Sequence, residues 1–301
     1  MLNRRNKLLL LKVLSLFSVV RGYNILVIAL AQYLASIYIL APELPVRKVV
    51  FDVNLFVIVI ASAMVIAGGY IINNFYDAEK DLINKPRKSM LDRLVSQRFK
   101  LTTYFVLNFL AVIAASYVSF RAVFFFSSYI FGIWIYSHKL KKIPFLGNFI
   151  SATLAITPFF VVFIYYKNIQ PVIFMHAVFL FLLILAREMI KDLENISGDL
   201  AQNYRTIPII YGSRTSKILI SLLILLTIVP SLLLIFKFDV GHMNLYFMLC
   251  VILLVLFIFL LFKAKARKDY VWLHNILKLI IVMGVFGILL IDVDLVLNRI
   301  L

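Results

Sequence analysis

Long apolar runs recur along the chain from Tyr23 to Leu297, and only short polar segments separate them. A helix needs about 20 mostly apolar residues to cross the hydrocarbon layer of a bilayer. Nine runs meet this length, and they are centred near residues 32, 62, 110, 129, 155, 180, 227, 253 and 285. Only residues 119–121 separate the runs near 110 and 129, so the count depends most on that region. The pattern predicts an all-α, polytopic membrane protein with nine transmembrane helices.

Composition favours a single membrane domain, which we assign to residues 23–301. The chain is 63% hydrophobic and 15% charged, whereas soluble domains average roughly 45–50% apolar and about 25% charged residues. In the preceding segment, residues 1–22, Lys12 interrupts the apolar stretch 8–20. This interruption favours a cytoplasmic amphipathic segment at the membrane interface over a secretory signal. The one cysteine, Cys250, excludes a disulfide framework and a thiolate metal cluster.

The net charge of +17 would suggest nucleic-acid binding in a soluble protein, but here the basic residues follow the membrane topology. The N-terminal segment and the loops after the second, fourth, sixth and eighth runs hold 24 of the 31 Lys and Arg residues. The opposite side holds six, and Lys278 lies within the ninth run. Because short cytoplasmic loops are enriched in Lys and Arg, this asymmetry predicts a cytoplasmic N-terminus and no nucleic-acid partner.

Acidic residues are few, and they gather in two places. Of the 14 in the chain, eight lie in two loops: Asp77, Glu79, Asp81 and Asp92 follow the second run, and Glu188, Asp192, Glu194 and Asp199 follow the sixth. The loops are four runs apart, which suggests two four-helix halves plus a ninth helix. Sites in membrane proteins with related halves often lie between the halves. We therefore expect the two acidic clusters to face each other across one cavity.

Each cluster has helical spacing that gathers oxygen ligands on one face. If the second run continues as a helix, Asn73, Asp77 and Asp81 share a face, and residues 188, 192, 195 and 199 do so on the sixth. Carboxylates near a bilayer need a compensating cation. Oxygen ligands without His or Cys suit Mg²⁺, which commonly binds carboxylates together with substrate phosphates. The alternative is that both are solvated hydrophilic loops whose acids pair with nearby Lys or Arg.

Basic residues near the same loops fit an anionic substrate. Those after the first cluster are Lys85, Arg87 and Lys88; those after the fourth run are Lys139, Lys141 and Lys142; those beside the second cluster are Arg187 and Lys191. Arg21 and Asn24 lie at the edge of the first run, where Arg could contact phosphate oxygens. Each is also explained as a positive-inside marker or, for Arg21, a lipid-headgroup anchor.

Two signatures resemble those of the UbiA superfamily of intramembrane prenyltransferases. The first is Asn73 to Asp81 with its continuation 83–86, in which Asn74 stands where the family usually has Asp. The second is Arg187 to Asp199 followed by 206–209 and Gly212, in which Asn195 replaces an Asp. Residues 136–142 with 147–148 are similar to a third family segment. The resemblance implies a nine-helix UbiA-like bundle.

The resemblance also implies Mg²⁺-dependent transfer of a prenyl group from a prenyl diphosphate. The implied catalytic residues are Asp77, Asp81, Asp192 and Asp199, and the implied metal ligands are these four with Asn73 and Asn195. The implied substrate-binding residues are Arg21, Asn24, Asn73, Lys85, Arg87, Tyr136, Lys139, Lys142, Arg187 and Lys191. The loops 73–100 and 187–216 are candidates for a lid that excludes water from an allylic cation.

The acceptor is the open question. Lys191-Asp192 and the 83–86 continuation most resemble the branch that transfers geranylgeranyl to geranylgeranylglyceryl phosphate in ether-lipid synthesis. In that case a further basic pocket should hold the acceptor phosphate, and Lys139 and Lys142 are the candidates. An aromatic acceptor in quinone or haem synthesis is the alternative. A non-catalytic transporter is a third possibility, but it would carry charges near the membrane midplane, where only Lys278 lies.

Overall fold

The computed structural model describes residues 4–293, and within that range nine helices are long and apolar enough to cross a bilayer. They are α2 (Gly22–Ala35, extended by the π-helical turn Ser36–Leu40), α4 (Val53–Tyr76), α7 (Gln97–Val118), α8 (Phe120–His138), α9 (Leu146–Tyr166), α10 (Pro171–Ala201), α11 (Ile207–Phe236), α12 (Asn244–Lys263) and α13 (Arg267–Gly287). Shorter helices are α1 (Arg4–Val20), α3 (Val46–Val50), α5 (Ala78–Asn84) and α6 (Pro86–Asp92). The predicted all-α membrane fold is confirmed.

Side-chain caps explain where several helices begin. The Asp52 carboxylate accepts hydrogen bonds from the backbone N–H groups of residues 54 and 55 at the start of α4. Ser119 has an extended backbone between α7 and α8, and its hydroxyl accepts from the Ala122 N–H. Such caps satisfy N–H groups that have no partner within the helix. Ser119 therefore divides the apolar region 101–138 into two separate helices.

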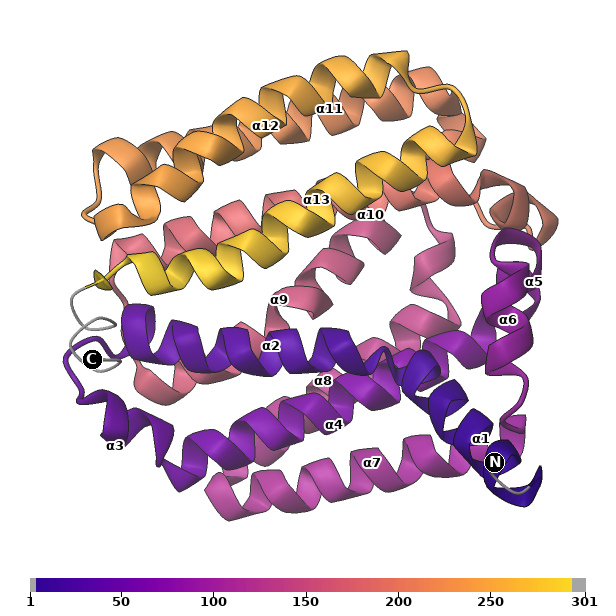
Figure 1. Ribbon diagram of the computed structural model, residues 1–301, viewed down its shortest axis with the longest axis horizontal. Helices are drawn as coiled ribbons and strands as arrows, with labels where there is room; N and C mark the ends of the chain where they lie inside the picture. Colours follow the sequence, from indigo (N-terminus) through magenta and orange to yellow (C-terminus); the bar gives the residue numbers. More distant parts are fainter. Residues whose placement is uncertain (1–3, 294–301) are drawn as a thin grey trace.

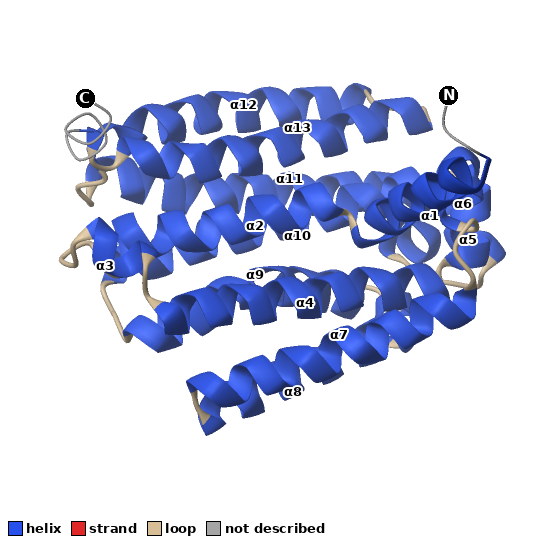
Figure 2. Cartoon of the chain, turned by 60° about the horizontal axis from the view of Figure 1, so that its bottom comes forward, coloured by secondary structure: helices blue, strands red, loops and turns tan. Residues whose placement is uncertain are grey.

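The long helices lie side by side in one bundle (Figures 1 and 2). The bundle has two hydrophobic cores. One core centres on α4, α7 and α8, and includes Leu55, Ala111 and Phe126; the other is built by α10 to α13 around Leu183, Ile224, Phe257 and Leu277. The ninth helix, α13, contacts both α10 and α2, so it joins the second half to the first. This arrangement leaves space between α2, α4, α8, α9, α10 and α13.

Small residues bring α4 close to its neighbours. A methyl group added at Gly68 would lie 3.0 Å from the Asn108 side chain of α7, and one added at Gly69 would lie 3.1 Å from Ile133 of α8. Close backbone approach through small residues is a common means of helix packing in membranes. The glycine pair just before the first acidic cluster therefore serves packing.

The first acidic cluster differs from the continuous helix that its spacing suggests. The α4 helix ends at Tyr76, and Asp77 has φ −94° and ψ 6° at the junction with α5. Backbone bonds from Asp77 N–H to Asn73 O and from Asp81 N–H to Asp77 O keep the three positions stacked across the bend. The second cluster does continue its helix, because α10 runs unbroken through Asp199.

Candidate active site

The two acidic clusters meet at one end of the bundle, which we call the polar end and which comprises α5, α6 and the last turns of α10. Asn84 joins them: its side-chain oxygen accepts the Gly198 N–H at 3.1 Å, and its amide donates to Asn195 O at 3.4 Å. Arg267 of α13 donates to Asn84 O and Glu194 O. Gly198 has no side chain to obstruct the Asn84 amide. A helix-to-helix contact therefore fixes the clusters side by side.

Both clusters line one polar cavity of about 50 Å³. Its lining includes Glu188 of the second acidic cluster and nine of the predicted site residues: Arg21, Asn73, Asp77, Asp81, Lys85, Tyr136, Lys191, Asp192 and Asn195. They come from helices on both halves of the chain. The expected meeting of the two clusters is therefore present in the structure.

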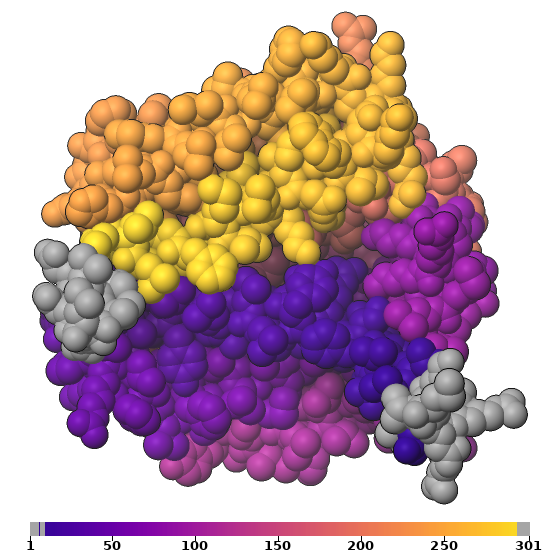
Figure 3. All heavy atoms as spheres, in the orientation of Figure 1, coloured from indigo at the N-terminus to yellow at the C-terminus, as the bar shows by residue number. Residues whose placement is uncertain are grey.

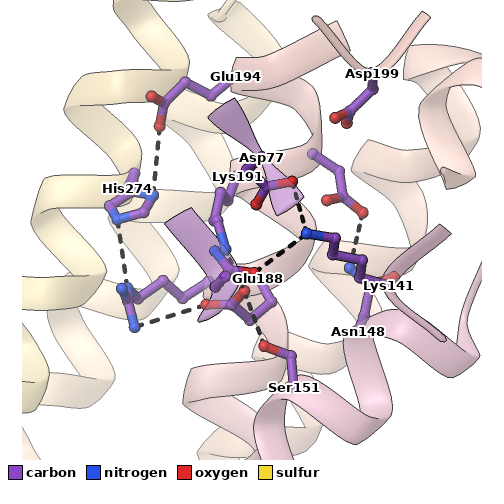
Figure 4. Close-up of polar contacts among 12 residues, drawn as sticks. Asp77, Lys141, Asn148, Ser151, Glu188, Lys191, Glu194, Asp199 and His274 are labelled. Atoms are coloured by element: carbon purple, nitrogen blue, oxygen red, sulfur yellow. Dashed lines mark hydrogen bonds and ion pairs between the residues drawn. The ribbon is translucent and has the colours of Figure 1, made fainter. Parts of the chain in front are cut away.

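Asp77 has two side-chain partners on the cavity wall. Lys141 Nζ lies 2.7 Å from its Oδ1 (Figure 4). The Tyr204 hydroxyl donates to the same oxygen at 3.1 Å. Burial opposes ionisation of Asp77, but the attraction of Lys141 and Lys80 outweighs it, so the pKa of Asp77 lies below its ordinary value. Burial lowers the pKa of Lys141 to about 8, and Asp77 offsets only part of that effect. At neutral pH the pair is charged.

The acids of α10 have separate partners. Asn148 Nδ2 donates to Asp192 Oδ2 at 2.8 Å, and Lys80 Nζ lies 2.7 Å from Asp199 Oδ1. Asp199 is only 1% exposed and does not line the cavity. In Figure 4 its carboxylate lies away from the group around Lys191. Direct contact of Asp199 with a ligand therefore requires Lys80 to move, which the sequence pattern does not indicate.

Glu188 organises the basic side chains on the inner side of the cavity. It accepts from Lys191 at 2.8 Å and from Ser151 at 3.1 Å, and Arg187 lies 3.8 Å from its other oxygen. Arg187 also donates to His274 at 3.4 Å. These contacts link α9, α10 and α13 beside the polar cavity.

The polar cavity continues into two larger ones along the bundle. A central cavity of about 330 Å³ is lined by six helices and shares Arg21, Asn73, Tyr136, Glu188 and Lys191 with it. An apolar cavity of about 150 Å³ lies beyond and shares Ala31, Phe159, Leu180, Ile281 and Val285 with the central one. The cavity lining thus changes along the bundle from polar, through partly polar, to apolar. This order suits a ligand with a charged head and a long hydrocarbon tail.

Three predicted binding residues lie elsewhere. Arg87, Lys139 and Lys142 are exposed and line neither the polar nor the central cavity, so a role for Lys139 and Lys142 in binding the acceptor phosphate stays a prediction. In the short turn after α8, Lys141 reaches Asp77, whereas Lys142 Nζ lies 5.3 Å from the centroid of the Tyr204 ring. Asn24 and Arg187 line the central cavity only.

The site residues predicted from the sequence leave out five that the tertiary structure brings to the cavity. Lys80, Lys141, Asn148, Tyr204 and Thr206 all line the polar cavity. Lys141 was visible as part of a basic run, but nothing in the run distinguished it from its neighbours. Tyr204 follows α10 without any motif of its own.

Asn74, the departure from the family pattern, points away from the cavity into a buried polar network. Lys100 Nζ donates to Asn74 Oδ1 at 2.9 Å, and Asn74 Nδ2 donates to Asp92 Oδ2 at 3.0 Å. Lys88 and Ser18 also contact Asp92. The network ties α4 to α1, α6 and α7. A carboxylate at position 74 would lie beside Asp92, so the amide avoids repulsion between two buried acids.

The cavity supplies oxygen donors that fit a hard divalent ion shared with a phosphate ligand. Within residues 4–293, no three His, Cys, Asp or Glu side chains are grouped closely enough to hold a metal unaided. However, Asn195 Oδ1 is buried without a hydrogen-bond partner, and Asp77 and Asp199 each already bind an ammonium group. Because Mg²⁺ usually completes its shell with water and substrate phosphate, this incomplete donor set suits it.

Comparison with known proteins identifies the family. The UbiA prenyltransferase family model matches residues 29–274. The chain belongs to the UbiA prenyltransferase family. Membership confirms the prediction of a UbiA-type intramembrane prenyltransferase that is integral to a membrane, and it excludes the non-catalytic transporter.

The UbiA relatives include archaeal proteins named digeranylgeranylglyceryl phosphate synthase. The chain is 30% identical to that of Thermococcus gammatolerans over 227 residues, covering 74% of this chain and 80% of the relative. It is 29% identical to that of Thermococcus kodakarensis, covering 90% and 95%. With the protein of Thermococcus sibiricus it shares 34% identity, but the match spans 55% of this chain and 59% of the relative.

Solved UbiA structures share the fold. A digeranylgeranylglyceryl phosphate synthase has a TM-score of 0.69 at 22% identity and covers 92% of this chain and 97% of its own. A UbiA homologue from Archaeoglobus fulgidus, bound to DMAPP and Mg²⁺, has a TM-score of 0.66 at 13% identity and covers 91% and 98%. At these identities the likeness establishes the arrangement of the helices.

Proposed function

We propose that this protein transfers a geranylgeranyl group from its diphosphate to geranylgeranylglyceryl phosphate with the help of Mg²⁺. The observation that carries the proposal is the cavity in which both acidic clusters meet and which opens into an apolar interior. The named function of the Thermococcus relatives supports the choice of acceptor. The ligands of the Archaeoglobus fulgidus homologue support a prenyl diphosphate and Mg²⁺.

The metal ligands of the proposal are Asn73, Asp77, Asp81, Asp192 and Asn195, with Asp199 reached only after Lys80 moves. When bound there, Mg²⁺ would stabilise the negative charge of the departing diphosphate as a Lewis acid. The side chains Asn148 and Tyr204 hold Asp192 and Asp77 in fixed orientations, since each donates one hydrogen bond to them. Preorganised ligands lower the cost of assembling the site.

Basic side chains bind the diphosphate and neutralise its charge. Lys80, Lys85, Lys141 and Lys191 line the same cavity as the acids. Lys141 and Lys80 each lie 2.7 Å from a carboxylate oxygen, of Asp77 and Asp199 respectively. If Asp77 and Asp199 held Mg²⁺, the amines of Lys141 and Lys80 would be free to contact phosphate oxygens. The exchange of partners keeps every buried charge compensated, because the lysines never lack an anion.

The reaction replaces one C–O bond by another. The bond between the prenyl carbon and the diphosphate breaks, the acceptor hydroxyl oxygen bonds to that carbon, and diphosphate and one proton are released. The central cavity would hold the reacting carbon, where Tyr70, Tyr129 and Tyr136 present aromatic rings that stabilise positive charge. The apolar cavity beyond holds the hydrocarbon tail, so little water reaches the allylic cation.

The polar end of the bundle is proposed to face the cytoplasm. The supporting observation is the concentration of Lys and Arg in the loops at that end. The separate segment 1–22 is proposed to lie along the same membrane surface. There α1 packs on α4 and α6, and Arg21, at φ 50°, separates it from α2 (Figure 1). The active site would then receive Mg²⁺ and phosphate groups from the cytoplasmic side.

A direct assay tests the function. The purified protein is incubated with labelled geranylgeranyl diphosphate, Mg²⁺ and geranylgeranylglyceryl phosphate or an aromatic acid acceptor. We expect ether product with the glyceryl phosphate alone, its loss on chelation with EDTA, and at least a 100-fold fall in rate for Asp77→Asn. The exposed substitution Asp239→Asn, far from the site in sequence and outside both cavities, serves as control. Product with the aromatic acid alone, or unchanged turnover by Asp77→Asn, would refute the proposal.

A further inference from the structure

Lys278 is a charged residue placed where the helix around it is apolar. It lies midway along α13, between Leu277 and Leu279, and it lines the central cavity. Its Nζ contacts Tyr23 of α2, at 3.3 Å from the hydroxyl and 4.5 Å from the ring centroid. An ionisable side chain within a membrane span is costly and usually has a functional partner. A neutral tyrosine does not balance its charge.

Two arginines line the same cavity as Lys278. Arg21 lies at the start of α2 over the Tyr70 ring, 5.0 Å from its centroid. Arg187 shares the single carboxylate of Glu188 with Lys191. Among residues 4–293, neither Arg21 nor Lys278 has an acidic side chain within 4.0 Å. The central cavity thus has four basic side chains and one acidic side chain in its lining, and an anion would compensate the excess.

The cavity is open to the side. Figure 3 shows the surface hollowed between α2, in indigo, and α13, in yellow. These are the helices that Tyr23 and Lys278 connect, and the rest of the cavity lining is mostly apolar. A lipid that entered from the bilayer through this gap could keep its hydrocarbon chains in apolar surroundings while its charged head met the basic group.

We propose that Lys278, Arg21 and Arg187 form a subsite for the phosphate monoester of the lipid acceptor, at the lateral opening between α2 and α13. The subsite rests on the proposed function and adds the place where the acceptor head binds. A phosphate monoester carries about two negative charges near neutral pH, which matches the uncompensated charge of Lys278 and Arg21. Lys80, Lys85 and Lys141 line the polar cavity but not the central one, so the donor diphosphate has basic partners that the acceptor phosphate does not share.

Steady-state kinetics of Lys278→Met tests the subsite. Methionine preserves the length and apolar stem of lysine but removes the charge. We expect the KM for geranylgeranylglyceryl phosphate to rise about 10- to 100-fold, the range for loss of a charge-assisted hydrogen bond. The KM for geranylgeranyl diphosphate should stay within about twofold of wild type. Lys278→Arg should retain most of the acceptor affinity. Lys268→Met, an exposed site on the same helix outside these cavities, is the matched control.

A phosphate-free acceptor, geranylgeranylglycerol, isolates the headgroup. Wild type should prefer the phosphorylated acceptor to the alcohol. Lys278→Met should lose most of that preference, because its KM for the phosphorylated acceptor rises while its KM for the alcohol is unchanged. A rise in the diphosphate KM alone would assign Lys278 to the donor and overturn the subsite. An unchanged acceptor KM would also overturn it and leave Lys278 as an anchor to membrane-lipid headgroups. Absence of ether product from wild type would instead refute the proposed function, so the two failures are distinct.

Discussion

The Lys141–Asp77 pair leads to a quantitative prediction about the stability of the folded protein. The two side chains are 6% and 9% exposed, and their charged atoms lie 2.7 Å apart. Lys141→Met leaves Asp77 buried with one hydrogen bond, from Tyr204, and the more distant attraction of Lys80. Removing one partner of a buried pair typically costs about 3–5 kcal/mol. Because Asp77 keeps part of its compensation, we expect a loss of about 3 kcal/mol in the free energy of unfolding.

Thermal unfolding of the purified protein in detergent micelles, with and without Mg²⁺, measures this effect. Lys142→Met is the control, since its exposed side chain lies next in sequence and outside the cavity. It should change the free energy of unfolding by no more than about 0.5 kcal/mol. If Mg²⁺ and the Lys141 amine compete for Asp77, Mg²⁺ should raise the unfolding temperature of Lys141→Met more than that of wild type. A ligand at 100 times its Kd contributes about 2.7 kcal/mol.

Two results would refute this reasoning. Equal stability of Lys141→Met and Lys142→Met would show that the ammonium group does not stabilise Asp77. Equal stabilisation of wild type and Lys141→Met by Mg²⁺ would show that the ion does not take the place of the amine. The first result concerns the ion pair, and the second concerns the proposed metal ligand.

Three further predictions concern the same end of the molecule. Burial lowers the pKa of Lys141 to about 8. The rate of prenyl transfer should therefore fall as the pH rises through 8, because the amine loses its proton. Lys141→Arg stays charged, so its pH–rate profile should lack this alkaline decline. Between pH 8 and 10.5, the ordinary pKa of lysine, Lys141 is deprotonated in the folded protein but still protonated in the unfolded chain. Its titration therefore makes the free energy of unfolding increase with pH over this range. Lys100→Met should destabilise the protein by about 2–4 kcal/mol in thermal unfolding, because it leaves Asn74 without its buried donor. If Lys100→Met lost no more stability than the exposed Lys268→Met, the Lys100–Asn74 hydrogen bond would not stabilise the fold. Gly198→Ala should reduce the rate of prenyl transfer at least 10-fold, since its methyl group collides with the Asn84 amide that joins α5 to α10. The control is Gly132→Ala, whose methyl group meets only Leu154. Equal rates for the two variants would show that transfer does not depend on this contact between α5 and α10.

Local patterns were enough to predict the membrane architecture. Apolar length fixes the number of spans because the thickness of the bilayer is fixed. Helical spacing also placed Asn73, Asp77 and Asp81 near one another, although the chain bends at Asp77. The convergence of the two clusters followed from their equivalent positions four spans apart. These inferences depend on neighbours in sequence or on symmetry, both of which can be read without coordinates.

The direction in which individual side chains point depends on the tertiary structure. Lys139, Lys141 and Lys142 are equivalent in charge and adjacent in sequence, yet only Lys141 reaches Asp77, because the turn between α8 and α9 directs it inward. Asn74 is next to Asn73 but faces Lys100 and Asp92, since consecutive helical residues point about 100° apart.

The sequence by itself determined a nine-helix membrane protein of the UbiA type with two acidic clusters, because bilayer thickness and helical periodicity act within short segments. Only the tertiary structure decided which lysine neutralises which acid, how Asn84 and Gly198 join the clusters, and where the cavity opens between α2 and α13. Those features arise between helices that are far apart in sequence. Their positions depend on how all the helices pack together.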